Sequence, residues 1–499
     1  MSWLPFIPLA FLVGSGLLIM LADAFTGDRN DPTKQGAELA ILTSVSLFVA
    51  GAISLTALVH GDAGSGPDFI APYLTADAMA LFFDATICLG AGLCALLAGG
   101  YLREHGLERG EFYVLLLFSA LGAMILARAV DMLSLFIGLE TMSLGVYAMV
   151  GYRRSSPRAV EGAVKYFLLG SFAAAILLFG AALVYAGTGA TGFAAIGAKI
   201  ASGDTEISLV IFGMLMVLVG LAFKVSAVPF HMWTPDAYEG AATPATTFMS
   251  VAVKASAFAV FVRVCLVAFG DELSASVATG WPPVLAGLAI VSMVYGNLAA
   301  AVQNNIKRML AYSSIAHAGY ILVGLAAAFA VGESAVSAVL YYLLAYTVGN
   351  VLAFGSLIAL GSRGREATSY ADLAGVGRRH PMAALPFVLG VLTLMGFPPT
   401  AGFFGKYYVF NAAVEAGGGF VWLAVLGVLA SAIGAYYYLR VVVSMFMKEP
   451  EEGAPIAVPM KNGYVAAAVI ISALLVIDFG IMPSSILELA GEAARQLLG

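Results

Sequence analysis

Charged residues are scarce in this chain. Only 11% of its 499 residues are Asp, Glu, Lys or Arg, whereas a soluble globular protein carries roughly 25%. Hydrophobic residues make up 61%, and so few charges cannot cover a core of that size in water. The solvent is therefore lipid, and a water-soluble fold is excluded. The net charge of −6 is spread thinly, which leaves no basic patch for nucleic acid.

Several chemical signatures are also missing. The three cysteines, Cys88, Cys94 and Cys265, lie in apolar segments without C-x-x-C spacing. They indicate packing rather than a disulfide framework or an iron–sulfur site. The sequence contains no G-x-x-x-x-G-K-S/T motif, no G-x-G-x-x-G after a strand and no metal-ligand cluster, so no cofactor-binding or metal site is predicted. Residues 1–6 contain no basic residue, so we interpret them as the start of a retained first helix rather than a signal peptide.

What the sequence has in abundance is apolar runs of membrane-spanning length. A helix needs roughly 20 apolar residues to cross the hydrocarbon core, and such lengths follow one another along almost the whole chain. We therefore predict an all-α polytopic membrane protein with about fourteen transmembrane helices. The predicted spans are 3–25, 37–59, 78–101, 112–127, 130–151, 158–186, 207–235, 242–269, 282–302, 306–331, 335–360, 383–416, 420–446 and 463–482.

The positions of Lys and Arg predict the orientation. Cytoplasmic loops carry an excess of these residues, and fifteen of the 24 fall in alternate loops if the N-terminus is outside. An even number of crossings then places both termini on the outer, periplasmic side. The fifteen are Arg29, Lys34, Arg103, Arg109, Arg153, Arg154, Arg158, Lys307, Arg308, Arg363, Arg365, Arg378, Arg379, Lys448 and Lys461.

Two stretches, 207–241 and 383–417, do not fit a simple helix. Each is 35 residues long, about 52 Å if helical, which is too long for one straight crossing and too short for two. Pro229, Pro398 and Pro399 each remove a backbone donor and predict a helix break. As the seventh and twelfth crossings, the two run in opposite directions, a pattern typical of inverted-repeat transporters with a site near the midplane. Two unrelated proline kinks are the alternative.

A few charges lie inside the predicted spans. A charge at a helix centre costs about 2.5–3.5 kcal/mol on insertion scales, and such residues usually face the bundle interior on ion or proton paths. Glu140 and Lys254 fall near mid-membrane, Lys224 precedes the first break and Lys406 follows the second. Thr247, Ser250 and Lys254 share one helix face. Lysines whose protonation depends on their neighbours would suit a coupled proton relay.

Three further residues have two interpretations each. Lys165 follows Glu161 by four residues, which suits a structural ion pair as well as a relay. His231 lies just beyond Pro229, and His317 lies on a polar helix face with Ser313 and Tyr320. A membrane histidine is more often a hydrogen-bonded packing residue than a relay, but a neighbouring lysine series favours function.

Four ordered motifs carry a family resemblance. The runs FIGLETMSLGVYAMVGYRRSS (136–156), GLAFKVSAVPFHMWTPDAYEGA (220–241), NIKRMLAYSSIAHAGY (305–320) and GFPPTAGFFGKYYVF (396–410) look like the subunit N family of proton-translocating NADH–quinone oxidoreductase, respiratory complex I. The resemblance covers nearly the whole chain. It implies the antiporter-like fold: fourteen helices with two inverted five-helix repeats, a broken helix in each, and a central row of charged residues.

Carried over by position, the resemblance implies a proton pathway. Glu140, Lys224, Lys254 and Lys406 resemble the family's charged positions, and Lys165 and His231 resemble further polar positions. The sibling subunit M carries a glutamate where Lys406 stands, and subunit L continues into a long lateral helix, whereas this sequence ends about seventeen residues after its last predicted span. Ala242 departs from the proline expected there, which leaves the start of the eighth helix less constrained.

The domain prediction is a single membrane domain, 1–499. Helices one to three occupy 1–111. The first repeat covers 112–270, with its broken helix at 207–241. The second repeat covers 281–447, with its broken helix at 383–417. The last helix and a tail fill 461–499.

The resulting functional expectation is a proton-translocating subunit of a translocase in the bacterial cytoplasmic membrane. NADH, FMN, iron–sulfur clusters and quinone are expected in partner subunits and none in this chain. The expected partners are subunit M, the small membrane subunits and lipid, without nucleic acid. The alternatives are a subunit of a multi-subunit cation/proton antiporter and the sibling subunit M. A quinone-binding enzyme or a scaffold is disfavoured, because no headgroup pocket is indicated and a scaffold needs no buried charges.

Overall fold

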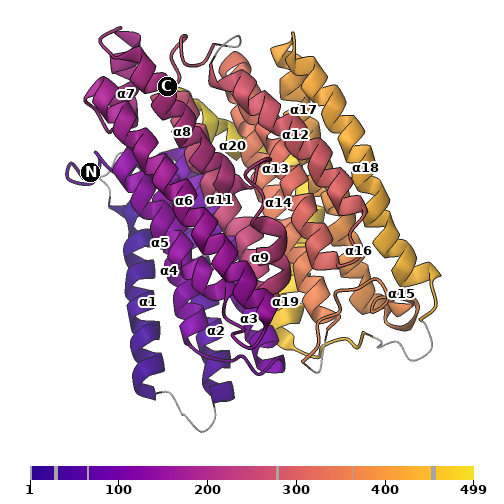
Figure 1. The fold of residues 1–499 in the computed structure, drawn as a ribbon. Coiled ribbons are helices and arrows are strands. Elements are labelled where there is room, and N and C mark those ends of the chain that lie inside the picture. The colour runs from indigo at the N-terminus through magenta and orange to yellow at the C-terminus, as the bar shows by residue number, and fades with distance from the viewer. Residues whose placement is uncertain (1–2, 27–31, 65–66, 277–279, 362–363, 451–456) are drawn as a thin grey trace.

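The computed structural model describes residues 3–26, 32–64, 67–276, 280–361, 364–450 and 457–499. These residues form a bundle of long helices that run roughly side by side (Figure 1). Among the described residues, extended pairing is limited to isolated bridges in loops. The all-helical membrane fold predicted from composition is confirmed. Arg29 and Arg363, two of the basic residues used to predict orientation, lie outside the described ranges.

The first five long helices are α1 (Ile7–Thr26), α2 (Pro32–Val59), α3 (Ala78–Glu104), α4 (Glu111–Arg128) and α5 (Met132–Val150), after a short 3-10 turn at Leu4–Phe6. Helix α3 is almost wholly buried between its neighbours. Asp77 caps α3 by accepting a hydrogen bond from Ala80 N, and Asp131 caps α5 at Leu133 N and Ser134 N. The caps satisfy amide groups that a helix start leaves unpaired.

The next group contains the first broken helix. It comprises α6 (Pro157–Thr188), α7 (Phe193–Ala201), α8 (Ile207–Val225) and α9 (Thr234–Gly240). A continuous apolar helix follows, made of α10 (Thr243–Phe248), a π-helical turn (Met249–Val253), α11 (Lys254–Arg263) and a second π-helical turn (Val264–Ala268). Helix α8 ends where Ser226 adopts the left-handed conformation, and the chain is unwound until Thr234. The predicted break at Pro229 is therefore present.

The remaining helices are α12 (Trp281–Ala301), α13 (Ile306–Val331), α14 (Glu333–Ala359), α15 (Val376–Arg379), α16 (Pro381–Met395), α17 (Ala401–Ala416), α18 (Phe420–Met447), α19 (Gly463–Ile481) and α20 (Pro483–Leu498). Gly396 takes the left-handed conformation at the end of α16, and Thr400 precedes α17. Pro398 and Pro399 lie in the gap between, as the sequence predicted.

Thirteen helices in the described residues are long and apolar enough to cross a membrane, one fewer than the fourteen predicted. The difference is the span 383–416, because α16 and α17 on either side of the break are each too short to count alone. The tail beyond the last span is also more ordered than expected. It forms the amphipathic helix α20, which packs against α3 and α14.

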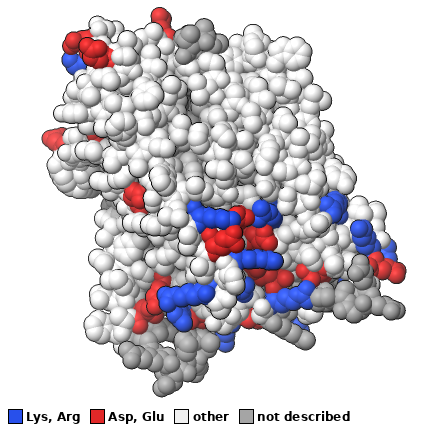
Figure 2. Space-filling view, viewed as in Figure 1, with Lys and Arg blue, Asp and Glu red and all other residues white. Residues whose placement is uncertain are grey.

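The two ends of the bundle differ in charge. On the face shown in Figure 2, most charged side chains gather in the lower part, while the upper part is nearly uncharged apart from one corner. Both chain ends lie in the upper half of the bundle in Figure 1. We call the lower end, which carries Arg153, Arg158, Lys307, Arg308 and Arg378, the basic end. The positive-inside rule predicts that it faces the cytoplasm.

Candidate functional site

Lys224 is the first lysine of the predicted charged residues. It lies one residue before the end of α8 and is buried. Its Nζ donates hydrogen bonds to Ser143 Oγ on α5 at 2.8 Å and to Tyr166 Oη on α6 at 3.2 Å. Glu140 lies one helical turn before Ser143, and its carboxylate interacts electrostatically with Lys224. The two predicted residues therefore share one site among three helices.

The first helix break is held in place beside Lys224. Thr234 Oγ1 donates to Ser226 Oγ at 2.8 Å, and Val228 N donates to Ser292 Oγ at 2.9 Å. Trp233 stacks on the Tyr166 ring with centroids 4.0 Å apart. Such contacts satisfy unwound backbone and fix it inside the protein, where irregular backbone is tolerated at membrane depth.

Lys254 lies at the centre of the bundle. It is the first residue of α11, after the π-helical turn, and is buried. Its Nζ donates to both the carbonyl oxygen and Oγ of Ser314 at 2.6 Å and lies 5.5 Å from the centre of the Tyr346 ring. Tyr238 Oη is 3.5 Å from the same Ser314 hydroxyl. Because Tyr238 also contacts Trp233 edge-on, aromatic and hydroxyl groups continue from Lys224 to Lys254.

His317 continues the row beyond Lys254. It is buried on α13, and its ring lies 5.0 Å from that of Tyr346. Its Nδ1 is 2.8 Å from Tyr342 Oη, and its Nε2 is 3.3 Å from Tyr438 Oη. Both ring nitrogens therefore have hydroxyl partners, an arrangement suited to passing a proton between them.

Lys406 lies at the second break. Its Nζ donates to Met395 O, in the last turn of α16, at 2.8 Å and to Ser431 Oγ on α18 at 2.8 Å. It also lies 4.8 Å from the centre of the Tyr320 ring, which packs edge-to-face on His317. The structure thus brings Glu140, Lys224, Lys254, His317 and Lys406 into one row from α5 to α17.

Two predicted relay candidates lie away from this row. The Lys165 side chain is 43% exposed and forms ion pairs with Glu161 at 2.5 Å and Asp236 at 2.7 Å. This is the structural pair that the sequence allowed. His231 is partly buried in the unwound turn after Pro229 and contacts the Tyr295 ring at 4.8 Å. His317, by contrast, packs against the Tyr346 and Tyr320 rings that lie over Lys254 and Lys406, so geometry favours it as the relay of the three.

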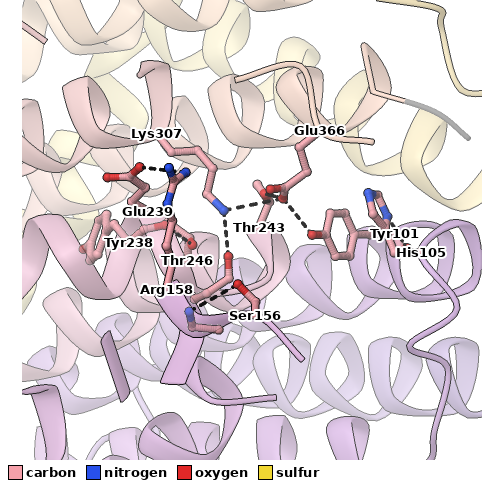
Figure 3. Close-up of polar contacts among 12 residues, drawn as sticks. Tyr101, His105, Ser156, Arg158, Tyr238, Glu239, Thr243, Thr246, Lys307 and Glu366 are labelled. Atoms are coloured by element: carbon pink, nitrogen blue, oxygen red, sulfur yellow. Dashed lines mark hydrogen bonds and ion pairs between the residues drawn. The ribbon is translucent and has the colours of Figure 1, made fainter. Parts of the chain in front are cut away.

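A second polar cluster lies at the basic end (Figure 3). Glu366, from the loop after α14, accepts hydrogen bonds from Tyr101 on α3 at 2.7 Å and from Thr243. Lys307 Nζ lies 3.4 Å from the same carboxylate and donates to Ala241 O at 2.6 Å. Burial raises the pKa of Glu366, but the Lys307 charge and the hydrogen bonds from Thr243 and Tyr101 outweigh it and hold that pKa below its usual value.

Sequence reasoning missed most of the partners of the buried charges. Tyr166, Tyr238, Tyr346 and Tyr438 supply hydroxyls or ring faces along the row. In the sequence they are indistinguishable from the other tyrosines among the 21 of the chain. Tyr166, Tyr346 and Tyr438 share one signal, because each lies within an apolar helix where a phenol needs a polar partner, whereas Tyr238 lies in the short polar helix α9. Among the described residues, no group of three or more His, Cys, Asp or Glu could hold a metal ion.

Fold and site together define a class: a polytopic membrane protein with two interrupted helices and a buried row of ionisable groups. Residues 129–434 match the family described as NADH:quinone oxidoreductase/Mrp antiporter, transmembrane. A relative in Sorangium cellulosum, NADH-quinone oxidoreductase subunit N 1, is 55% identical over 496 residues, which cover 97% of each chain. The chain therefore belongs to the subunit N family of NADH-quinone oxidoreductase.

Solved structures agree with this assignment. A chain of respiratory complex I from Thermus thermophilus with bound aureothin is 34% identical, with a TM-score of 0.78 over 97% of this chain and 99% of that one. A chain of the Mrp complex from a Dietzia species has a TM-score of 0.85 over the full length of both, at 20% identity, which shows a shared fold alone. The chain is thus a multi-pass membrane subunit of bacterial complex I, whose cofactors lie in other subunits. The prediction of subunit N over subunit M is confirmed.

Proposed function

We propose that this subunit moves protons through the membrane along Glu140, Lys224, Lys254 and Lys406, with His317 as the relay between the last two. The observation that carries the proposal is the row itself: each lysine ammonium is buried against hydroxyls and tyrosine rings. A buried charge without a function would be selected against in hydrocarbon. Each lysine therefore has a polar neighbour to which a proton can pass.

The energy source lies outside this chain. Moving a unit charge against 100 mV requires about 2.3 kcal/mol, and the buried groups supply no chemical reaction of their own. We propose that NADH oxidation and quinone reduction in partner subunits change the charge of one member of the row. A change at one site would then alter the proton affinity of the next, as coupled titrations require.

The two breaks support an inverted-repeat arrangement as part of the proposal. The repeats would cover 112–270 and 281–447, with α8–α9 and α16–α17 as matching broken helices. Each break ends its first half with a left-handed residue, Ser226 or Gly396, and each has a lysine close by. Loosened backbone on both sides of the row would let the protein open it first to one side and then to the other.

The outer surfaces of the bundle support the proposed partners. Helices α6, α12, α18 and α19 each keep much of their apolar surface exposed. In the assembled membrane arm these faces would contact subunit M, the small membrane subunits and lipid. NADH, FMN, iron–sulfur clusters and quinone would be bound by other subunits.

Proton pumping by the reconstituted complex tests the proposal. NADH-driven acidification of the vesicle lumen is measured for Lys254→Ala and for the control Lys199→Ala. Lys199, in the last turn of α7, pairs with Asp204 at 3.1 Å, and both side chains are exposed and lie outside the row. We expect Lys254→Ala to lower pumping at least threefold with the subunit still assembled, and Lys199→Ala to leave it unchanged. Sodium- or potassium-dependent collapse of a proton gradient without NADH would instead favour a cation/proton antiporter.

A further inference from the structure

An apolar cavity of about 420 Å³ lies among helices α2, α3, α14, α19 and α20. Its lining includes Phe48 and Leu55 on α2, Phe82 on α3 and Leu489 on α20. Of the described residues that line it, only Thr86 is polar, and the Thr86 hydroxyl donates to Phe82 O at 2.9 Å within its own helix. The cavity has the size of a small-molecule site but offers an occupant no free hydrogen-bonding group. It therefore favours a hydrocarbon over water, which needs polar partners.

The length of this cavity matches one leaflet of a bilayer. Its lining on α2 runs from Phe48 to Leu58, and those ten residues rise about 15 Å along a helix. The hydrocarbon core of a bilayer is about 30 Å thick, so the cavity is as long as the part of the core that one acyl chain crosses. Ala52 and Leu55, which also line it, are exposed. The cavity is therefore open to the outer surface of the bundle, where lipid lies.

A second, polar cavity of about 360 Å³ adjoins the apolar one. Leu58 lines both cavities, and α20 contributes Glu492, Arg495 and Gln496 to the polar one. Leu489, Glu492 and Gln496 follow at i, i+3 and i+7, so one side of α20 changes from apolar to polar lining. Figure 1 shows α20 in the upper half of the bundle, away from the basic end. The polar cavity therefore lies where the headgroup would be if an acyl chain filled the apolar cavity.

The polar cavity carries one cation and one anion in its lining. Gln496 Oε1 accepts from Ala78 N at the start of α3 at 2.5 Å, which ties this end of α20 to the bundle. Arg495 Nη1 pairs with Glu333 Oε1 at the start of α14 at 2.5 Å, and the Arg495 side chain is 61% exposed. A guanidinium has five N–H donors, so Arg495 keeps donors for a phosphate beside Glu333. Glu492 is exposed and supplies a negative charge for an amine.

We propose that the two cavities together bind one glycerophospholipid with an amine-bearing, zwitterionic headgroup. One acyl chain fills the apolar cavity, Arg495 donates to the phosphate, and Glu492 pairs with the ammonium group. The planar guanidinium fork suits phosphate, and charge-assisted hydrogen bonds of this kind are the strong ones. An anionic headgroup without an amine would leave Glu492 without a counter-charge. The lipid would join α2 to α20, both of which pack on α3. None of the described lining residues belongs to the lysine row.

Photolabelling of the full complex tests the site. The complex is reconstituted into phosphatidylglycerol vesicles that contain a small fraction of a phosphatidylethanolamine with a diazirine on one acyl chain. After illumination, mass spectrometry measures the label on each peptide of this subunit, and native gels check assembly. Ala85→Phe adds a ring to the apolar cavity, and Ala175→Phe on the exposed face of α6 is its control. Arg495→Gln removes the phosphate ligand. Glu333→Gln is its matched control, because it breaks the same ion pair but keeps the guanidinium.

We expect the wild type to carry label on the α2 and α3 peptides that line the apolar cavity. Ala85→Phe should lower that label at least threefold and Arg495→Gln at least twofold, with both controls at the wild-type level. A phosphatidylglycerol with the same diazirine chain should label these peptides at least twofold less. If the added ring prevents assembly, the exposed Arg495 and Glu333 variants decide the test.

Three results would overturn the inference. The first is no label on the cavity peptides, or the same label in assembled Ala85→Phe, which would show that a partner subunit or bulk lipid alone covers the cavity. The second is an equal loss of label in Arg495→Gln and Glu333→Gln, which would show that the ion pair accounts for the effect. The third is equal labelling by the phosphatidylglycerol probe, which would show that the headgroup amine is not recognised.

Discussion

The Arg128–Asp84 pair gives a sharp test of how the fold is held together. Both side chains are 0% exposed. Arg128 Nε donates to Asp84 Oδ2 at 2.9 Å, and its Nη2 donates to the same oxygen and to Pro5 O at 2.7 Å. Ser54 Oγ donates to Asp84 at 3.2 Å. Asp131, only three residues from Arg128 in the sequence, caps α5 instead.

Asp84→Asn leaves the guanidinium buried without its counter-charge. Removing one partner of a buried ion pair costs about 3–5 kcal/mol, while replacing both by apolar residues of similar volume is often neutral. We therefore expect Asp84→Asn to be strongly destabilised and the double variant Asp84→Leu/Arg128→Met to recover most of the loss. The exposed control is Asp204→Asn, whose carboxylate is 81% exposed, so its pair with Lys199 is worth about 1 kcal/mol or less.

The assay heats the purified complex and uses native gels to measure the temperature at which this subunit is lost. Because the Arg128–Asp84 pair has no contact with the lysine row, the assembled Asp84→Asn fraction should still pump protons at the wild-type ratio per NADH. If Asp84→Asn and Asp204→Asn unfolded at the same temperature, the reasoning about buried charge would be refuted.

Two further predictions concern packing and pH. A Cβ at Gly213 would lie 2.7 Å from Gly180 O, so Gly213→Ala should force α6 and α8 apart, cost about 1–3 kcal/mol and lower pumping. A Cβ at Gly287 would meet nothing within 4 Å, so Gly287→Ala should change neither stability nor pumping. Equal melting temperatures of the Gly213→Ala and Gly287→Ala variants would refute the packing argument. Burial, opposed in part by a hydrogen bond from Tyr113, raises the pKa of Glu108 from 4.5 to about 7. The stability this group contributes is present below pH 4.5 and is lost as pH rises through about 7. The melting temperature of Glu108→Gln should therefore fall less between pH 5 and pH 8 than that of the wild type, and an unchanged slope would contradict the assignment.

Sequence patterns predicted the parts of the site that are energetically conspicuous. Lys224, Lys254 and Lys406 stand out because charge in an apolar span is costly. Pro229 and Pro398 mark the breaks because proline removes backbone donors. These local signals depend on single residues, so one sequence suffices to find them.

The partners of those residues could not be predicted in the same way. Ser314, Tyr346 and Ser431 reach the lysines only because α13, α14 and α18 pack around them. Glu366 lies in a loop 123 residues from Thr243, and no periodicity links the two. Periodicity within a helix predicts which side is buried but not which distant helix covers it.

The amphipathic pattern of α20 was present in the sequence but was interpreted as a tail. Its 16 residues are too few, and its apolar content is too low, for a membrane span. Packing against α3 and α14 orders it, because tertiary burial rather than propensity stabilises most short helices. The structure has thirteen candidate spans where the sequence predicted fourteen, because the second break divides one crossing into two short helices.

The ratio of protons pumped to electrons transferred, measured for the reconstituted Glu140→Ala/Lys224→Ala complex, tests the central claim most directly. The account predicts full assembly with a lower ratio than the wild type, because the row loses its first acid and its first amine. A wild-type ratio from a fully assembled double variant would contradict the claim that protons pass along this row.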